Sequence, residues 1–155
     1  MINEILQSIN QLLALDSTDD AEKERLLKKN SEADIRQLAG HLTTRDILIL
    51  AKIAQTSPYL QKDLHRQINI SQPTASRAVD RLIKLDLLTR TKMVHNQKEW
   101  QLTLTPLGQR IATLKQNFDQ ARQAQAATIA SHYTAAELAK FNQFIQEIIA
   151  LKTPQ

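Results

Sequence analysis

The sequence lacks cysteine entirely and contains only two glycines among its 155 residues. Without cysteine the chain forms no disulfide and no thiolate metal site. Two isolated glycines also exclude the glycine-rich loops that bind phosphate, because those loops need several glycines at close spacing. The longest unbroken apolar run, Ile47 to Ala51, is far too short for a membrane span or a signal peptide. We therefore expect a soluble, cytoplasmic protein with no membrane partner.

The net charge is +4, and the whole positive excess lies in one part of the chain. Residues 60–100 contain eight lysines and arginines against four acidic residues, whereas the remainder contains twelve of each sign. His65 and His95 lie in the same stretch. Such a local excess indicates a surface for nucleic acid, with a solvated basic face as the simpler alternative.

Apolar residues at helical spacing predict amphipathic helices at both ends of a mostly helical chain. The N-terminal stripe consists of Ile2, Ile5, Leu6, Ile9, Leu12 and Leu13. The C-terminal stripe follows a capping-box sequence at residues 134–137 and consists of Leu138, Phe141, Ile145, Ile148 and Ile149. Helices are also expected over 16–29, over 31–39 with Gly40 at the end, and from Pro106 to Ser131.

The middle of the chain predicts a series of short elements. Residues 43–46 have the form of a capping box, and the apolar residues of the helix that follows are Ile47, Leu50, Ala51 and Ala54. A helix of under three turns carries Leu60, Leu64 and Ile68. Ser71 then caps a helix whose inward residues are Ala75, Val79 and Leu82. Residues 87–105 predict a β-hairpin with a basic, flexible tip at 95–98.

The outer face of the helix that Ser71 caps is small at its start and basic along its length, because it carries Pro73, Thr74, Arg77, Arg81 and Lys84. A short helix, a tight turn, a polar-faced helix and a basic hairpin follow one another in the order of a winged helix-turn-helix. Small side chains at the entering end let such a helix approach the bases in a DNA groove.

Three segments resemble the MarR family of bacterial transcriptional regulators: "LTTRDILIL" at 42–50, "KDLHRQINISQPTASRAVDRLIKLDLLTR" at 62–90 and "LTPLG" at 104–108. The resemblance implies a mainly α fold with a small β-hairpin wing, a winged helix-turn-helix with N- and C-terminal dimerisation helices. The expected parts are an N-terminal dimerisation element (1–40), the DNA-binding domain (41–105) and C-terminal dimerisation helices (106–155). The alternative is a single chain whose two terminal stripes pack on each other.

Each polar residue of the basic stretch receives an expected role. We expect base reading by Gln72, Thr74, Ser76 and Arg77. We expect phosphate or wing contacts from Ser71, Arg81, Lys84, Lys92, His95 and Lys98. Asp80 and Arg90 are expected to pair and to brace the wing against the helix.

Two positions depart from the family pattern. Asn96-Gln97-Lys98 replaces the usual Asp-x-Arg of the wing, which removes a salt bridge typical of the family. Asp86 replaces the usual glycine after the recognition helix, and aspartate tolerates the left-handed backbone better than most residues.

The resemblance implies a homodimer that binds double-stranded DNA at a pseudo-palindromic operator and represses transcription, with a small-molecule effector. No cofactor is expected. We expect no metal site, because no two of the histidines (His41, His65, His95 and His132) share a helical face. We also expect no enzyme, because no nucleophile and base are suitably spaced. The alternatives are a helical protein–protein adaptor and a non-specific architectural DNA-binding protein.

Overall fold

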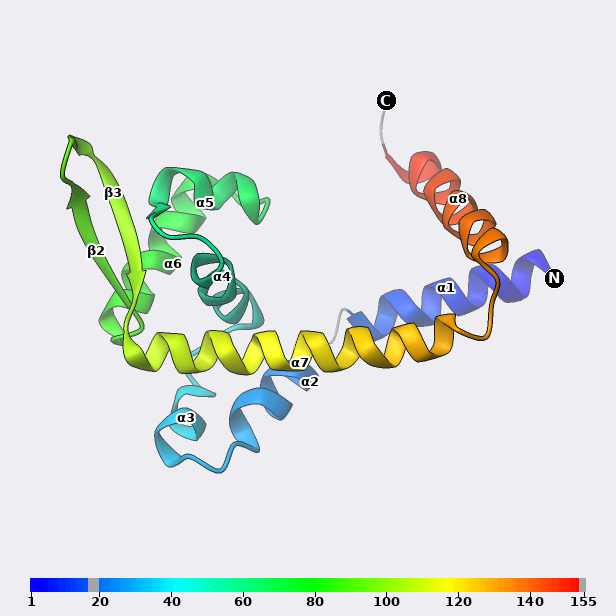
Figure 1. Cartoon of the computed structure of the whole chain (residues 1–155), viewed down its shortest axis with the longest axis horizontal. Coiled ribbons are helices and arrows are strands. Elements are labelled where there is room, and N and C mark those ends of the chain that lie inside the picture. The colour runs from blue at the N-terminus through cyan, green and yellow to red at the C-terminus, as the bar shows by residue number, and fades with distance from the viewer. Residues whose placement is uncertain (17–19, 154–155) are drawn as a thin grey trace. The chain divides into compact units, whose positions relative to one another are not determined.

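The structure is a computed structural model that describes residues 1–16 and 20–153. It is mostly helical with one small antiparallel sheet, which confirms the predicted fold class. The chain divides into two compact units, Met1–Gln116 and Asn117–Gln155. Helix α7 (Pro106–Ala130) begins in the first unit and ends in the second (Figure 1).

The N-terminal part of the first unit contains α1 (Ile2–Asp16), α2 (Asp20–Lys23), η1 (Glu24–Lys28) and α3 (Ala33–Leu38). The apolar stripe of α1 forms a helix as predicted, whereas residues 17–19 of the helix expected over 16–29 lie outside the described part. The η1 segment is a π-helical turn and not the α-helix expected there. The wider turn accompanies the burial of two successive leucines, Leu26 and Leu27.

The chain leaves α3 without the left-handed glycine that commonly follows a helix. Gly40 does not have a positive φ. Instead, the backbone N–H groups of His41 and Leu42 both donate to the Leu38 carbonyl, at 2.9 and 3.1 Å. The helix therefore ends near Gly40 as expected. It is capped by these two hydrogen bonds to the Leu38 carbonyl and not by a left-handed glycine.

The helix-turn-helix consists of α4 (Thr44–Ala54), α5 (Gln61–Gln67) and α6 (Gln72–Lys84). The capping box of α4 is confirmed, because Asp46 N donates to Thr43 Oγ1 and Thr43 N donates to Asp46 Oδ2, at 3.2 and 2.8 Å. The prediction that Ala54 faces inward is wrong, since it is exposed. Ile49 and Ile53 are buried instead, because burying an isoleucine removes far more apolar surface from water than burying an alanine.

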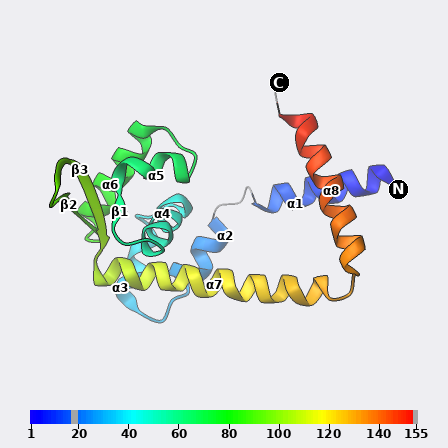
Figure 2. The same cartoon turned by 45° about the horizontal axis from the view of Figure 1, so that its top comes forward.

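The sheet has one more strand than predicted. It runs in the order β1 (Tyr59–Leu60), β3 (Asn96–Leu104), β2 (Leu88–Met93), with both pairs antiparallel. Figure 2 shows β1 beside the hairpin formed by β2 and β3. The hairpin is confirmed, but its turn lies at Val94 and His95 and not over 95–98. A register shift between Lys92 and Met93 brings Met93 opposite Asn96, so that two residues suffice for the turn.

The core of the first unit draws on most of its elements. Its largest fully buried apolar side chains are Leu27, Ile35, Ile47, Ile49, Leu50, Leu64, Val79, Leu82, Leu87, Leu88 and Ile111. These residues come from η1, α3, α4, α5, α6, β2, the turn before β2 and the start of α7. One hydrophobic cluster therefore fixes the position of α6 relative to the wing.

The turn after α6 and the start of α7 are in close contact. Thr105 caps α7, because its Oγ1 accepts from Gly108 N at 3.1 Å, and the same hydroxyl donates to the Asp86 carbonyl at 2.6 Å. A Cβ on Gly108 would lie 2.1 Å from the Leu87 carbonyl oxygen. Only glycine fits at this position, which explains why one of the two glycines stands here.

The second unit contains the last part of α7 and helix α8 (Ala135–Lys152). Helix α7 ends at Ala130, one residue before the predicted end. The capping box of α8 is confirmed, since Thr134 Oγ1 accepts from Glu137 N and Glu137 Oε2 accepts from Thr134 N. The hydrogen bond that Thr134 N donates to the Glu137 carboxylate, and a second one that Thr134 Oγ1 donates to it at 3.0 Å, lower the pKa of that carboxyl. Helix α8 has no buried residue.

Candidate nucleic-acid interface

Helix α6 presents a polar face to solvent because its other face is buried. Ala75, Ala78, Val79 and Leu82 pack into the core. At the start of the helix Ser71 Oγ accepts from Thr74 N at 3.3 Å and lies 2.7 Å from Thr74 Oγ1. The predicted cap at Ser71 is therefore confirmed, and the predicted inward face is also correct.

The side chains expected to read bases lie along this polar face. Gln72 and Arg77 are exposed, and Thr74 and Ser76 are partly exposed. Within residues 1–16 and 20–153, Arg77 makes no hydrogen bond and no ion pair. Its guanidinium is therefore available for an external acceptor, and an arginine fork suits the two acceptors of a guanine.

The turn after α6 also follows the prediction. Asp86 has a φ of 58°. Asp86 N donates to the Ile83 carbonyl and Leu87 N to the Leu82 carbonyl, both at 3.0 Å, which is the hydrogen-bond pattern of a Schellman motif. Helix α6 therefore ends sharply, and Leu87 and Leu88 return into the core.

Arg81 has a partner that the sequence did not indicate. Its guanidinium pairs with Asp46, whose carboxylate is fully buried and also completes the capping box of α4. A buried carboxylate needs a cation or several donors, and Asp46 has both. Arg81 thus attaches α6 to α4, while its expected phosphate contact stays a prediction. Lys84, in the last turn, is exposed.

The predicted contact between helix and wing is present. Arg90 Nη1 on β2 donates to Asp80 Oδ1 on α6 at 3.2 Å. Both groups remain partly solvated, and such pairs typically contribute less than about 1 kcal/mol. The pair sets the position of the wing more than it adds stability.

The basic side chains of the wing are accessible to solvent. Lys92, His95 and Lys98 are exposed, and Val94 at the turn is 85% exposed. Asn96, which replaces the acidic residue of the family pattern, accepts from Lys98 N with its Oδ1 at 3.1 Å. The asparagine therefore stabilises the start of β3 through its own backbone neighbour.

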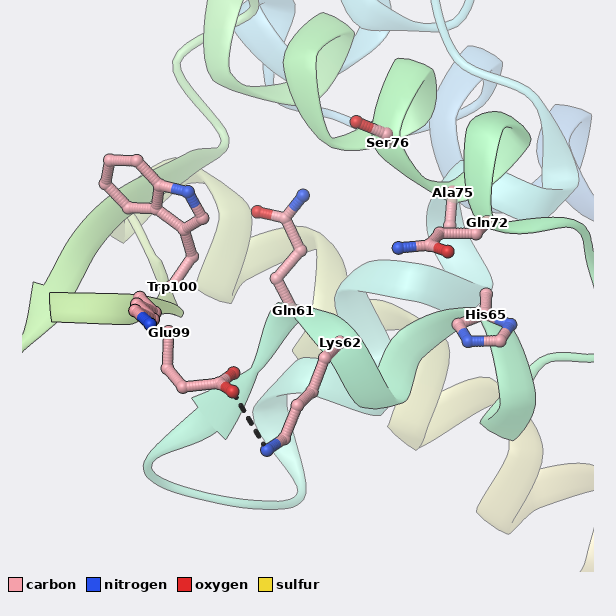
Figure 3. Close-up of a pocket in the computed structure, with 9 residues that line it drawn as sticks. Gln61, Lys62, His65, Gln72, Ala75, Ser76, Glu99 and Trp100 are labelled. Atoms are coloured by element: carbon pink, nitrogen blue, oxygen red, sulfur yellow. Dashed lines mark hydrogen bonds and ion pairs between the residues drawn. The ribbon is translucent and has the colours of Figure 1, made fainter. Parts of the chain in front are cut away.

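A pocket of about 270 Å³ lies between α5, α6 and β3. Figure 3 shows side chains from all three elements around it: Gln61, Lys62, His65, Gln72, Ala75, Ser76, Glu99 and Trp100. Lys98 is also part of its lining. Lys62 Nζ and Glu99 Oε1 form an ion pair at 3.1 Å (Figure 3).

Lys62 and His65 were not among the residues predicted to contact DNA. Both extend the basic surface from α6 and the wing onto α5. Helical spacing contained part of the signal, because Lys62 lies nearly opposite the buried Leu64 on α5, and His65 follows Lys62 by three residues.

Two features are absent from residues 1–16 and 20–153. In that part of the chain no helix is long and apolar enough to cross a membrane. No group of three or more His, Cys, Asp or Glu side chains is arranged there to hold a metal ion.

The family model that matches this chain is that of the MarR family, over residues 42–100. A curated relative is YhjH of Bacillus subtilis (strain 168), described as an uncharacterized HTH-type transcriptional regulator. The two sequences are 23% identical over 132 residues, which cover 81% of this chain and 75% of the relative.

Two solved structures have similar folds. The adhesin competence repressor AdcR of Streptococcus pyogenes is 20% identical, with a TM-score of 0.70 over 97% of this chain and 96% of that chain. A mutant of ZitR from Lactococcus lactis, solved in complex with DNA, is 15% identical, with a TM-score of 0.75 over 99% of this chain and 98% of that chain.

The fold and the interface define a winged helix-turn-helix protein. The match over 42–100 covers the helix-turn-helix and most of the wing, and it confirms the resemblance found in the sequence. Residues 42–100 are similar to the MarR family of regulators, and the fold of the chain is similar to those of AdcR and ZitR.

Proposed function

We propose that this protein is a homodimeric regulator that binds a specific pseudo-palindromic duplex and represses transcription until an effector binds. The observation that supports this proposal most directly is how helix α6 is held and which of its side chains stay exposed. Its inner face is buried, its side is attached to α4 and to the wing, and Gln72 and Arg77 on its outer face have no hydrogen-bond or ion-pair partner among the described residues. A rigid helix with unpaired donors is suited to base recognition.

The residues divide into three groups by what they would contact. Gln72, Thr74, Ser76 and Arg77 read base edges. Phosphates or the minor groove are contacted by Ser71, Arg81, Lys84, Lys92, His95 and Lys98, and Lys62 and His65 extend that surface. Asp80, Arg81 and Arg90 hold the recognition helix in place. The DNA-binding domain in this proposal is residues 41–105.

The second copy would cover the apolar faces of residues 1–40 and 106–155. Leu12 is 62% exposed on α1, and Phe141 is 59% exposed on α8. An apolar hollow of about 580 Å³ lies where α7 meets α8, lined by Ile129, Tyr133, Leu138 and Phe141 among others. Continuous apolar faces of this kind are typical of subunit interfaces. A two-fold dimer would place two copies of α6 about one DNA turn apart.

The effector in this proposal is a small molecule. AdcR is described as a repressor and ZitR as a zinc-responsive MarR family member. A thermal-shift screen with small aromatic and anionic compounds, and with Zn²⁺ as a separate arm, tests this part. A compound that raises the melting temperature and releases DNA supports it, and the absence of any stabilising compound counts against it.

The main test is selection of duplexes from a random pool by the purified protein, followed by gel shifts of the enriched sequence at several salt concentrations. We expect an inverted repeat whose half-site centres lie about ten base pairs apart. Steep salt dependence without an enriched sequence would indicate an architectural protein instead. No binding at low salt, with and without candidate effectors, would favour the helical adaptor.

A further inference from the structure

The wing contains an aromatic ring in contact with two cations. Lys92 Nζ lies 3.8 Å and Arg90 Cζ lies 4.9 Å from the centre of the Trp100 ring. Lys92 is directly opposite Trp100 in the pairing of β2 with β3, and Arg90 is two residues earlier on the same face. The negative face of the indole attracts both cations and offsets their mutual repulsion.

These contacts connect the wing to the recognition helix. Arg90 contacts the indole and also pairs with Asp80 on α6. A continuous path therefore runs from Asp80 through Arg90 and Trp100 to Lys92. Residues 96–98 are Asn-Gln-Lys, so they cannot form a salt bridge between an acid and an arginine within the wing. The path through Arg90 instead connects the outer half of the wing to α6.

We propose that Trp100 is a positioning residue for DNA binding, which holds the Lys92 ammonium in place beside the recognition helix. The inference rests on the proposed function. A free lysine side chain loses much rotamer freedom when it binds a phosphate, and a side chain that is already held loses less. The ammonium has three donors, so contact with the ring leaves donors for a phosphate oxygen.

The contact itself is testable without DNA, since Trp100 is the only tryptophan of the chain. Lys92→Met keeps most of the side-chain length and removes the charge, and we expect it to shift the fluorescence emission of Trp100. Lys98→Met is the matched control, because it removes the same charge from the wing, whereas among the described residues the cations over the ring are Arg90 and Lys92. Equal spectra for the two variants and the wild type would overturn the proposal.

The role in DNA binding is testable by a double-mutant cycle. We expect Trp100→Leu to weaken binding of the selected duplex about three- to tenfold, and Trp100→Phe to weaken it less, because both rings attract cations but indole does so more strongly. In a Lys92→Met background Trp100→Leu should have a clearly smaller effect. Circular dichroism and thermal melting identify any variant that has lost its fold, and Trp100→Phe serves if Trp100→Leu has.

The outcomes separate this proposal from the proposed function. Equal effects of Trp100→Leu in both backgrounds would mean that Trp100 acts independently of Lys92, which overturns the positioning role alone. No DNA binding by the wild-type protein would overturn the proposed function and this role together, even if the fluorescence experiment shows the contact in the free protein.

Discussion

At the scale of single residues, sequence recognition is expected to depend most on Arg77. Arg77→Ala should weaken binding to the selected duplex by about 1–3 kcal/mol per half-site and relax the preference for one base pair. Arg77→Lys keeps the charge but loses the two-pronged donor, so it should retain salt-dependent binding and lose specificity. Competition gel shifts measure both. Unchanged affinity and preference in Arg77→Ala would remove α6 from the role of recognition helix.

Asp86 allows a test of backbone conformation at one residue. Its left-handed φ of 58° disfavours any side chain, whereas glycine adopts it freely. Asp86→Gly should therefore raise the free energy of unfolding by about 0.5–1 kcal/mol, and Asp86→Val should lower it. Urea unfolding measures both variants. If Asp86→Gly lowered the free energy of unfolding, the aspartate side chain would stabilise the fold by more than its backbone strain destabilises it.

The ionisation of Tyr59 is expected to lower the stability of the first unit at high pH. Its hydroxyl donates to Gln67 Oε1 at 2.7 Å, and burial, followed by the charge of Asp63, raises the pKa of its phenol above 10.0. The unfolded chain therefore ionises Tyr59 at a lower pH than the folded protein does. The stabilisation is complete below pH 10.0 and is lost as the pH rises through the folded pKa.

Substitution separates this contribution from those of other groups that ionise in the same range. Tyr59→Phe should weaken the decline of the unfolding free energy as the pH rises above 10.0, as measured by urea titrations. Tyr133→Phe, at an exposed position, is the control and should keep the wild-type decline. Identical pH profiles for Tyr59→Phe and the wild type would contradict the prediction.

At the scale of secondary-structure elements, the wing is expected to contribute affinity without sequence preference. Lys98→Ala should weaken all duplexes alike and reduce the slope of log K against log salt by about 0.9, the value for one phosphate contact. Gel shifts between about 50 and 200 mM salt measure the slope. Lys140→Ala on α8 is the control and should leave it unchanged. A change confined to one sequence would instead assign base reading to Lys98.

The sequence predicts elements well where a local signal specifies them. The capping boxes at Thr43 and Thr134, the cap at Ser71 and the strained turn at Asp86 all depend on residues within a few positions of each other. The family resemblance added the expected division into terminal dimerisation helices and a central DNA-binding domain.

Elements that depend on distant contacts escaped prediction. Strand β1 has two residues and exists only because Tyr59 and Leu60 pair with Leu102 and Gln101. The hairpin turn moved toward the N-terminus of the predicted tip because of a register shift that no local pattern marks. The pairing of Arg81 with Asp46 joins residues 35 positions apart, so periodicity gave it no signal.

At the scale of the whole molecule, the exposed apolar face of α8 predicts self-association. Phe141→Lys should convert the protein to monomers at micromolar concentration and should abolish binding to the two-half-site duplex, because each copy supplies one recognition helix. Light scattering coupled to size-exclusion chromatography measures the mass. Asn142→Lys adds the same charge at the next, also exposed position and should stay dimeric. A monomeric wild type would favour packing of the terminal stripes within one chain.

The close contact at Gly108 makes the first turn of α7 intolerant of any side chain at this position. A methyl group there would lie 2.1 Å from the Leu87 carbonyl oxygen, so the backbone of the turn after α6 or of the first turn of α7 would have to move. Leu87 N and Asp86 N both donate to carbonyls of α6, so a shift of that turn would also disturb the end of α6. A single hydrogen atom in place of a side chain therefore allows the end of α6 and the start of α7 to be in direct backbone contact.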